Sequence, residues 1–178
     1  MNAQNPSYKS TMLIALGAAS ILLIPLIAMF FTEEVDWDLA DFLVAWIMLF
    51  GTGITYKLIS LKMSQSVQYK IATGLAVVGL LMIVWVNLAV GIIGNEENPV
   101  NLIFYAVHVI GIMGAFISRF EAKGMSYSAY AMAITLVIIG IITLVAGWGF
   151  IPIITAFFTI LFLISGMLYR KASERQTE

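Results

Sequence analysis

The chain has 178 residues, of which 61% are hydrophobic and only 11% are charged, and its mean hydropathy is +0.99. A water-soluble domain of this length needs more polar surface than these residues supply, so the composition excludes a soluble fold. No cysteine is present, which excludes disulfides, thiol catalysis and thiolate metal sites. Apolar and polar residues do not alternate strictly, so the sequence predicts membrane-spanning helices rather than a barrel.

Six apolar segments each have about the 20 residues that a helix needs to cross a hydrocarbon core. In chain order they cover residues 11–31, 40–61, 70–93, 101–118, 127–146 and 149–169. The first segment is too long for a signal peptide, so we interpret it as a membrane helix. The last two form one apolar run, which Gly147, Gly149 and Pro152 divide by favouring a turn followed by a new helix. The sequence therefore predicts an all-α integral membrane protein, a bundle of six transmembrane helices in a single domain over residues 1–178.

The charged residues alternate between successive connections of this predicted bundle. All nine basic residues lie in every second connection or at the termini: Lys9, Lys57, Lys62, Lys70, Arg119, Lys123, Arg170, Lys171 and Arg175. The connections between them hold seven of the ten acidic residues: Glu33, Glu34, Asp36, Asp38, Asp41, Glu96 and Glu97. Short loops rich in Lys and Arg stay in the cytoplasm. The pattern therefore predicts that both termini are cytoplasmic and that the outer face is acidic.

A weak internal repeat indicates that the bundle is built from helical hairpins. Tyr8-Lys9 recurs as Tyr69-Lys70, and each pair opens a helix that runs outward into an acidic loop. The returning helices begin at Asp41 and Asn101, and their small and polar residues align at a constant offset. In the third hairpin the acidic loop is replaced by Gly-Trp-Gly.

Polar residues gather into stripes on the second and fourth predicted helices. Lipid offers such groups no partner, so these faces should turn inward or toward a water-filled cavity. Asn87 and His108 both lie about 10 Å below the outer boundary, at 1.5 Å per residue. Adjacent helices would bring their amide and imidazole together, and Trp46 lies at a similar depth. The candidate cavity for a ligand or ion therefore comprises Asp41, Trp46, Asn87, Asn101, Tyr105 and His108.

Two of these residues also have a purely structural interpretation. His108 is the only histidine, and it suits a buried neutral imidazole, a titrating group on an ion or proton path, or a metal or haem ligand. Asp41 lies in the first turn of its helix, where a carboxylate caps free amides and favours the helix dipole. The sequence leaves these alternatives open.

The acidic loops contain residue types that bind hard cations such as Ca²⁺ or Mg²⁺. The weak metal candidates are Glu33, Glu34, Asp36, Asp38, Glu96 and Glu97. Their spacing matches no EF-hand, and solvated loops that attract cations are the simpler explanation. No cofactor is indicated. A nucleic-acid partner is not expected either, because the basic residues are scattered beside helix ends.

The segment from Val84 to Asn101, with the sequence VWVNLAVGIIGNEENPVN, resembles a segment of short polytopic inner-membrane proteins of bacteria. The stretches Trp37-Asp38 and Asp41-Phe42 are also similar to that family. The resemblance covers most of the chain and implies a bacterial inner-membrane location. It implies no activity.

Three functional classes fit these patterns to different extents. An accessory, structural or regulatory membrane protein needs only a packed bundle, with lipids, a second copy or another membrane subunit as its partners. A small oligomeric channel or transporter fits the acidic face and the polar stripes. An intramembrane enzyme fits least, because the chain has no GxSxG, HExxH, paired-Asp or Cys motif. We therefore expect a non-enzymatic membrane protein with an outward-facing polar cavity.

Overall fold

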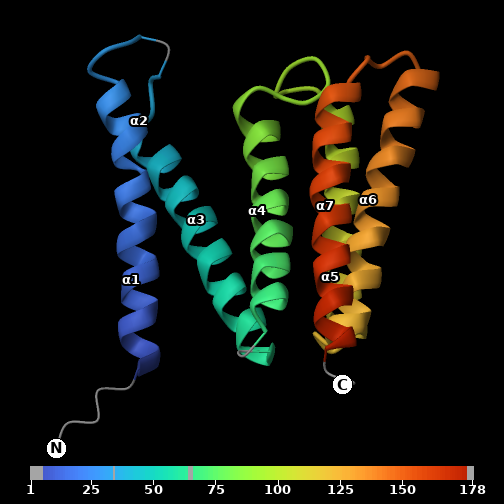
Figure 1. Ribbon diagram of the computed structural model, residues 1–178. Coiled ribbons are helices and arrows are strands. Elements are labelled where there is room, and N and C mark those ends of the chain that lie inside the picture. The colour runs from blue at the N-terminus through green and yellow to red at the C-terminus, as the bar shows by residue number, and fades with distance from the viewer. Residues whose placement is uncertain (1–5, 34, 64–65, 176–178) are drawn as a thin grey trace, which may run out of the picture. The chain divides into compact units, whose positions relative to one another are not determined.

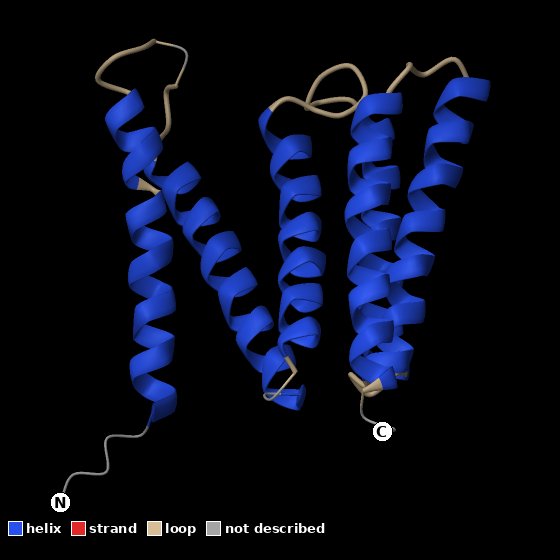
Figure 2. Cartoon of the chain, viewed as in Figure 1, coloured by secondary structure: helices blue, strands red, loops and turns tan. Residues whose placement is uncertain are grey.

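The computed structural model describes residues 6–33, 35–63 and 66–175, and within these residues the fold is entirely helical (Figures 1 and 2). Six helical stretches of the described chain are long and apolar enough to cross a membrane: Tyr8–Ala28, Leu39–Met63, Val67–Ala89, Pro99–Ile117, Ala122–Val145 and Pro152–Glu174. This confirms the expected number of apolar helices and the all-α class.

Backbone contacts divide the chain into two compact units, Met1–Lys57 and Leu58–Glu178. The single domain expected from the sequence stays a prediction. The hairpin repeat likewise stays a prediction. Most of the buried core lies in the second unit.

The first unit pairs α1 (Pro6–Ile21) and α2 (Leu23–Ala28) with α3 (Leu39–Ser60). The first predicted helix is interrupted at Leu22, shortly before Pro25, whose ring cannot donate a backbone hydrogen bond. Two side chains of α3 reach α1: Trp46 Nε1 donates to the Ala15 carbonyl at 3.4 Å, and Lys57 Nζ donates to Thr11 Oγ1 at 2.9 Å. These bonds and close packing of Ile14 on Gly53 hold the hairpin together.

The second unit is a four-helix bundle made of α4 (Val67–Ala89), α5 (Tyr105–Ile117), α6 (Ala122–Val145) and α7 (Pro152–Glu174). The short 3-10 helix η1 (Leu61–Met63) precedes α4, and η2 (Pro99–Phe104) leads directly into α5. Helix α7 packs against both α4 and α6, and α5 packs mainly against α6. Small residues allow the close approach of α5 and α6, because a side chain at Gly114 would overlap Ser128.

Several helix ends differ from the sequence prediction, and local backbone chemistry explains the differences. Helix α4 ends at Ala89 rather than residue 93, because Gly91 adopts a φ of +70°. Helix α7 begins at Pro152 rather than residue 149, after Gly147 and Gly149 have formed the turn at φ values of +68° and +159°. Helix α6 begins at Ala122, five residues before the expected start at residue 127.

Two buried tyrosines join the helices at the end of this bundle that carries the basic residues. Tyr169 on α7 donates to Thr73 Oγ1 at 3.0 Å, and Thr73 donates to the Tyr69 carbonyl at 2.9 Å. Tyr69 in turn donates to the Phe120 carbonyl at 2.6 Å, in the turn between α5 and α6. The two rings meet edge to face with centroids 5.1 Å apart. This chain of bonds therefore connects α7, α4 and the α5–α6 turn.

Replacing Tyr69 with Phe removes the bond to the Phe120 carbonyl while keeping the ring. We expect Tyr69→Phe to lower the free energy of unfolding by about 1 kcal/mol, the usual contribution of one buried hydrogen bond. Denaturant titration in detergent micelles measures this change. The matched control is Tyr127→Phe, an exposed tyrosine on α6, for which we expect less than about 0.5 kcal/mol. Equal losses in the two variants would contradict the assigned role of Tyr69.

Candidate functional site

The predicted site residues fall in both units, and the structure gives most of them partners within the protein's own backbone. Asp41 and Trp46 belong to the first unit, whereas Asn87, Asn101, Tyr105 and His108 belong to the second.

Asp41 caps the start of α3 together with Asp38. Asp41 Oδ2 accepts a hydrogen bond from the Asp38 amide at 2.9 Å, and Asp38 Oδ1 accepts one from the Asp41 amide at 3.0 Å. This reciprocal pair is a capping box, and it satisfies two amides at the end of the helix where negative charge is favoured. The structural interpretation of Asp41 is thus confirmed.

Trp46 occupies the middle of the α1–α3 hairpin. In addition to its bond to α1, its indole stacks on Phe50 with ring centroids 4.8 Å apart and an interplanar angle of 7°. The hydrogen bond uses the polar edge of the indole and joins α3 to α1, whereas the stacking lies within α3.

Asn101 organises the loop between α4 and η2. Its Oδ1 accepts from the amides of Ile92 and Ile93 at 3.1 and 2.8 Å. Its Nδ2 donates to the carbonyls of Ile93 and Asn95 at 3.2 and 2.7 Å. The side chain is 5% exposed, and these four bonds use its two donors and its two acceptor positions. Asn101 therefore shapes the loop and has no capacity left for a ligand.

The same loop depends on glycine and on a second asparagine. Gly91 and Gly94 have φ values of +70° and +71°, and a side chain at Gly91 would overlap the backbone of Asn95. Asn98 accepts from the Val100 amide at 3.0 Å and donates to the Ile93 carbonyl at 3.1 Å, which caps η2. The exposed side chains of Glu96 and Glu97 lie between these anchors.

Asn87 and His108 do not form the hydrogen bond expected between them. Each instead bonds to a carbonyl of α4: Asn87 Nδ2 donates to Ile83 at 2.9 Å, and His108 Nε2 lies 3.0 Å from the Leu80 oxygen. A carbonyl oxygen only accepts, so this geometry assigns a proton to Nε2. The His108 ring also contacts that of Tyr105, at 5.5 Å between centroids.

One acceptor atom of each of these two side chains stays unpaired. Asn87 Oδ1 and, in a neutral ring, the lone pair of His108 Nδ1 are buried and have no hydrogen-bond partner. The Phe104 carbonyl, one turn before His108, also lies near the ring, but it forms no hydrogen bond with Nδ1. Unpaired buried acceptors cost free energy, so they mark the part of the predicted site that is still able to take a hydrogen-bond donor.

The metal candidates do not assemble into a binding site in the described part of the chain. No three carboxylate or imidazole side chains come close enough there to hold a metal ion. Glu33, Asp36, Glu96 and Glu97 are exposed, Asp38 caps α3, and Glu34 lies outside the described residues.

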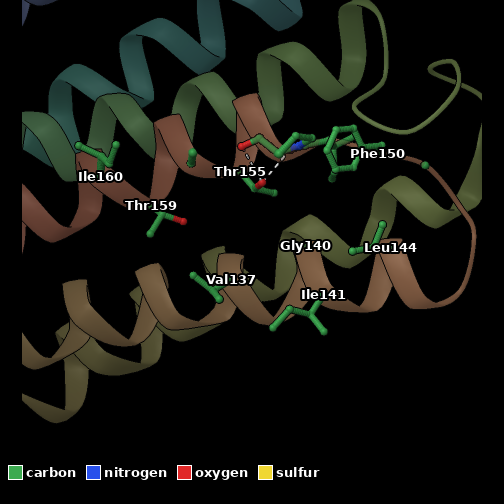
Figure 3. Close-up of a pocket in the computed structure, with 12 residues that line it drawn as sticks. Val137, Gly140, Ile141, Leu144, Phe150, Thr155, Thr159 and Ile160 are labelled. Atoms are coloured by element: carbon green, nitrogen blue, oxygen red, sulfur yellow. Dashed lines mark hydrogen bonds between the residues drawn. The ribbon is translucent and has the colours of Figure 1, made fainter.

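A pocket that the sequence prediction did not include lies between α6 and α7, with a volume of about 390 Å³ (Figure 3). Its walls are mainly apolar, and they extend from the loop at residues 149–151 toward Thr159 and Val137. The Thr155 and Thr159 pair is visible in the sequence as hydroxyls one turn apart. The hollow itself depends on Gly140 and Ala156, whose small side chains carry no functional signal.

In comparisons with known proteins, the chain matches no family model, no curated protein and no solved structure.

Asn101→Asp tests the role assigned to this side chain. The substitution keeps the acceptors but replaces two donors to the Ile93 and Asn95 carbonyls by a buried negative charge. We expect a loss of roughly 2–3 kcal/mol in unfolding free energy, together with faster hydrogen exchange in residues 91–98. The control is Asn95→Asp in the same loop, whose side chain is exposed and for which we expect less than about 0.5 kcal/mol. A stable Asn101→Asp variant with an unchanged loop would refute this role.

Proposed function

We propose that this chain is a multi-pass protein of the bacterial inner membrane, with both termini in the cytoplasm. We further propose that it acts as an accessory, structural or regulatory membrane protein rather than as an enzyme. Six apolar helices support the membrane location, because their exposed faces carry large hydrophobic side chains that need an apolar solvent. The segregation of all basic residues from seven acidic ones supports the orientation.

One observation carries the accessory role: the polar side chains of the predicted site are used mainly to hold the fold together. Asp41 caps a helix, Asn101 closes a loop, and Trp46 joins two helices. A catalytic or transport site instead keeps polar groups available for a substrate. The pocket between α6 and α7 is apolar and contains no ionisable residue. A protein that scaffolds lipids, a second copy or another membrane subunit fits this distribution best.

A small channel or transporter is the second candidate, and one feature favours it. Asn87 Oδ1 and His108 Nδ1 are unpaired acceptors in the second unit, inside helices that are long and apolar enough to span a membrane. Intramembrane polar groups of this kind often mark an ion or proton path. Of the polar cavity expected from the sequence, we retain Asn87, Tyr105 and His108 as the place where a cation or small ligand with hydrogen-bond donors would bind.

Single-cysteine labelling tests the proposed topology without background, because the chain contains no cysteine. We expect Glu33→Cys and Glu97→Cys to react in intact cells with a maleimide that does not cross membranes. Lys123→Cys and Lys171→Cys should react only after the cells are permeabilised. Mass shifts on gels measure the labelling, and the unsubstituted chain is the control. The reverse pattern, or equal labelling at all four positions, would exclude the N-in/C-in orientation.

Flux measurements separate the accessory role from transport. We expect purified protein in liposomes to pass protons and monovalent cations no faster than empty liposomes, as followed by an entrapped pH dye and ion-selective electrodes. His108→Ala should behave in the same way. Flux well above that of empty liposomes that disappears in His108→Ala would reject the accessory role and establish the transport alternative.

A further inference from the structure

The pocket between α6 and α7 has a shape and a chemistry that point to one class of ligand. Figure 3 shows side chains from both helices around it, with Val137, Gly140 and Leu144 on one side and Phe150, Thr155 and Thr159 on the other. The two helices draw apart toward the loop that connects them, which Figure 1 also shows. The pocket therefore lies at the end of the second unit that is remote from the tyrosine network.

Small residues create the hollow in the walls. Gly140 has no side chain, and a Cβ placed there would lie 3.5 Å from Thr155 Cγ2, at ordinary contact distance. Ala156 contributes only a methyl group, one position beyond Thr155. The bulkier Val137, Leu144 and Ile160 flank these residues and define the rim. The cavity thus arises from small residues on both α6 and α7.

The polar atoms near the pocket are mostly withdrawn from it. Thr155 Oγ1 donates to carbonyls at the start of its own helix, Ile151 at 2.7 Å and Pro152 at 3.2 Å, so its hydrogen is already used. Thr159 Oγ1 is buried without a hydrogen-bond partner. None of the lining residues is charged. The pocket therefore offers no charge to an ion or a phosphate group, and its mainly apolar walls favour an apolar occupant.

We propose that this pocket binds one acyl chain of a phospholipid from the outer leaflet. The inference rests on the proposed membrane location, because both helices then place the pocket within the hydrocarbon region. On α7 the lining extends from Pro152 to Ile160, which is about 12 Å along the helix axis. An extended alkyl chain matches this length and the uncharged walls.

The size of the site favours a lipid chain over a second copy of the protein. Twelve residues line the pocket, whereas a stable protein interface takes about 20–30 residues on each side. A volume of about 390 Å³ also lies in the range of small-ligand pockets, which is roughly 300–1,000 Å³. A protein partner would fill it only by inserting a single side chain.

The energy of this binding comes from packing rather than from the hydrophobic effect. A lipid tail in the bilayer is already in apolar surroundings, so it gains little by leaving them. In the pocket, however, the chain touches walls from both helices and so gains more dispersion contacts than on a single helix face. The bound lipid should therefore exchange slowly compared with the bulk lipid and persist through mild detergent extraction.

Filling the pocket tests the proposal directly. The chain is reconstituted in phosphatidylethanolamine vesicles with a minor share of phosphatidylglycerol and is then extracted in mild detergent. Native mass spectrometry measures the mass of the protein together with any bound lipid. We expect the unsubstituted protein to retain one phospholipid, and Ala156→Trp to retain it about tenfold less. The matched control is Ala106→Trp, an exposed alanine on α5 that does not line the pocket, which should retain lipid normally.

Two further variants distinguish the loss of the lipid from misfolding of the protein and from the binding of a polar ligand. Ala156→Leu fills less of the pocket and should give an intermediate loss, while circular dichroism confirms that its helix content is unchanged. Thr159→Val removes the unpaired hydroxyl at constant size, so retention of an alkyl chain should stay equal or rise. Loss of the ligand in Thr159→Val would show that the occupant accepts or donates a hydrogen bond, and would overturn the proposal.

The remaining outcomes are also decisive. Equal lipid retention in Ala156→Trp and Ala106→Trp would overturn the acyl-chain site, even if cysteine labelling confirms the proposed topology. Loss of a second protomer's mass, instead of a lipid's, in Ala156→Trp would identify the pocket as a dimer contact. A failure of the topology itself would appear separately, in the labelling of Glu97→Cys and Lys123→Cys.

Discussion

The constraint on which this structure depends is that polar groups in very apolar helices must find their partners inside the protein. The hydroxyls of Thr73, Thr135 and Thr143 donate to carbonyls three or four residues earlier in their own helices. Ser165 on α7 instead donates to the Ala72 carbonyl on α4 at 2.9 Å and so joins two helices. In the membrane location proposed here no water competes for these bonds, and most polar residues are consequently committed to the fold.

The two ends of the four-helix unit meet this constraint differently. At the basic end, Tyr169, Thr73 and Tyr69 form a continuous series of bonds that crosses helix boundaries. At the other end, Thr143 and Thr155 donate only to carbonyls close to them in sequence. The bonds at the basic end thus join α7 to α4, and α4 to the turn that precedes α6. Helices α6 and α7 separate where side chains bond locally, and the pocket lies at that separated end.

The helix count and the all-α class follow from the sequence because hydropathy and segment length act on about 20 residues at once. Helix ends depend on single residues, and there the prediction is less accurate. The positive φ of Gly91, for example, ends α4 four residues early. The charge pattern predicts which connections lie on the same side of the membrane, but it carries no information on how two helical units pack. Membrane orientation is therefore argued from sequence, and packing within each unit comes from the structure.

The candidate site was harder to predict for a physical reason. Sequence reasoning selects Asp41, Asn101 and His108 because polar residues are rare in such helices, and rarity signals either function or structural need. The structure assigns Asp41 and Asn101 to structural need, since backbone amides and carbonyls use their polar atoms. Asn87 and His108 each keep one unpaired acceptor, which no pattern of residue types reveals.

A pocket that forms because side chains are small is equally hard to predict from a sequence. Gly140 and Ala156 look like ordinary packing residues, and elsewhere in this unit such residues do bring helices together, as Gly114 does against Ser128. The difference lies in the partner: Gly114 meets a neighbouring backbone closely, whereas Gly140 faces Thr155 where the two helices are already diverging. A small residue therefore closes an interface when the helices converge and opens a pocket when they diverge. In a chain whose polar residues are largely committed to its own backbone, a binding surface for lipid arises most readily from such missing volume.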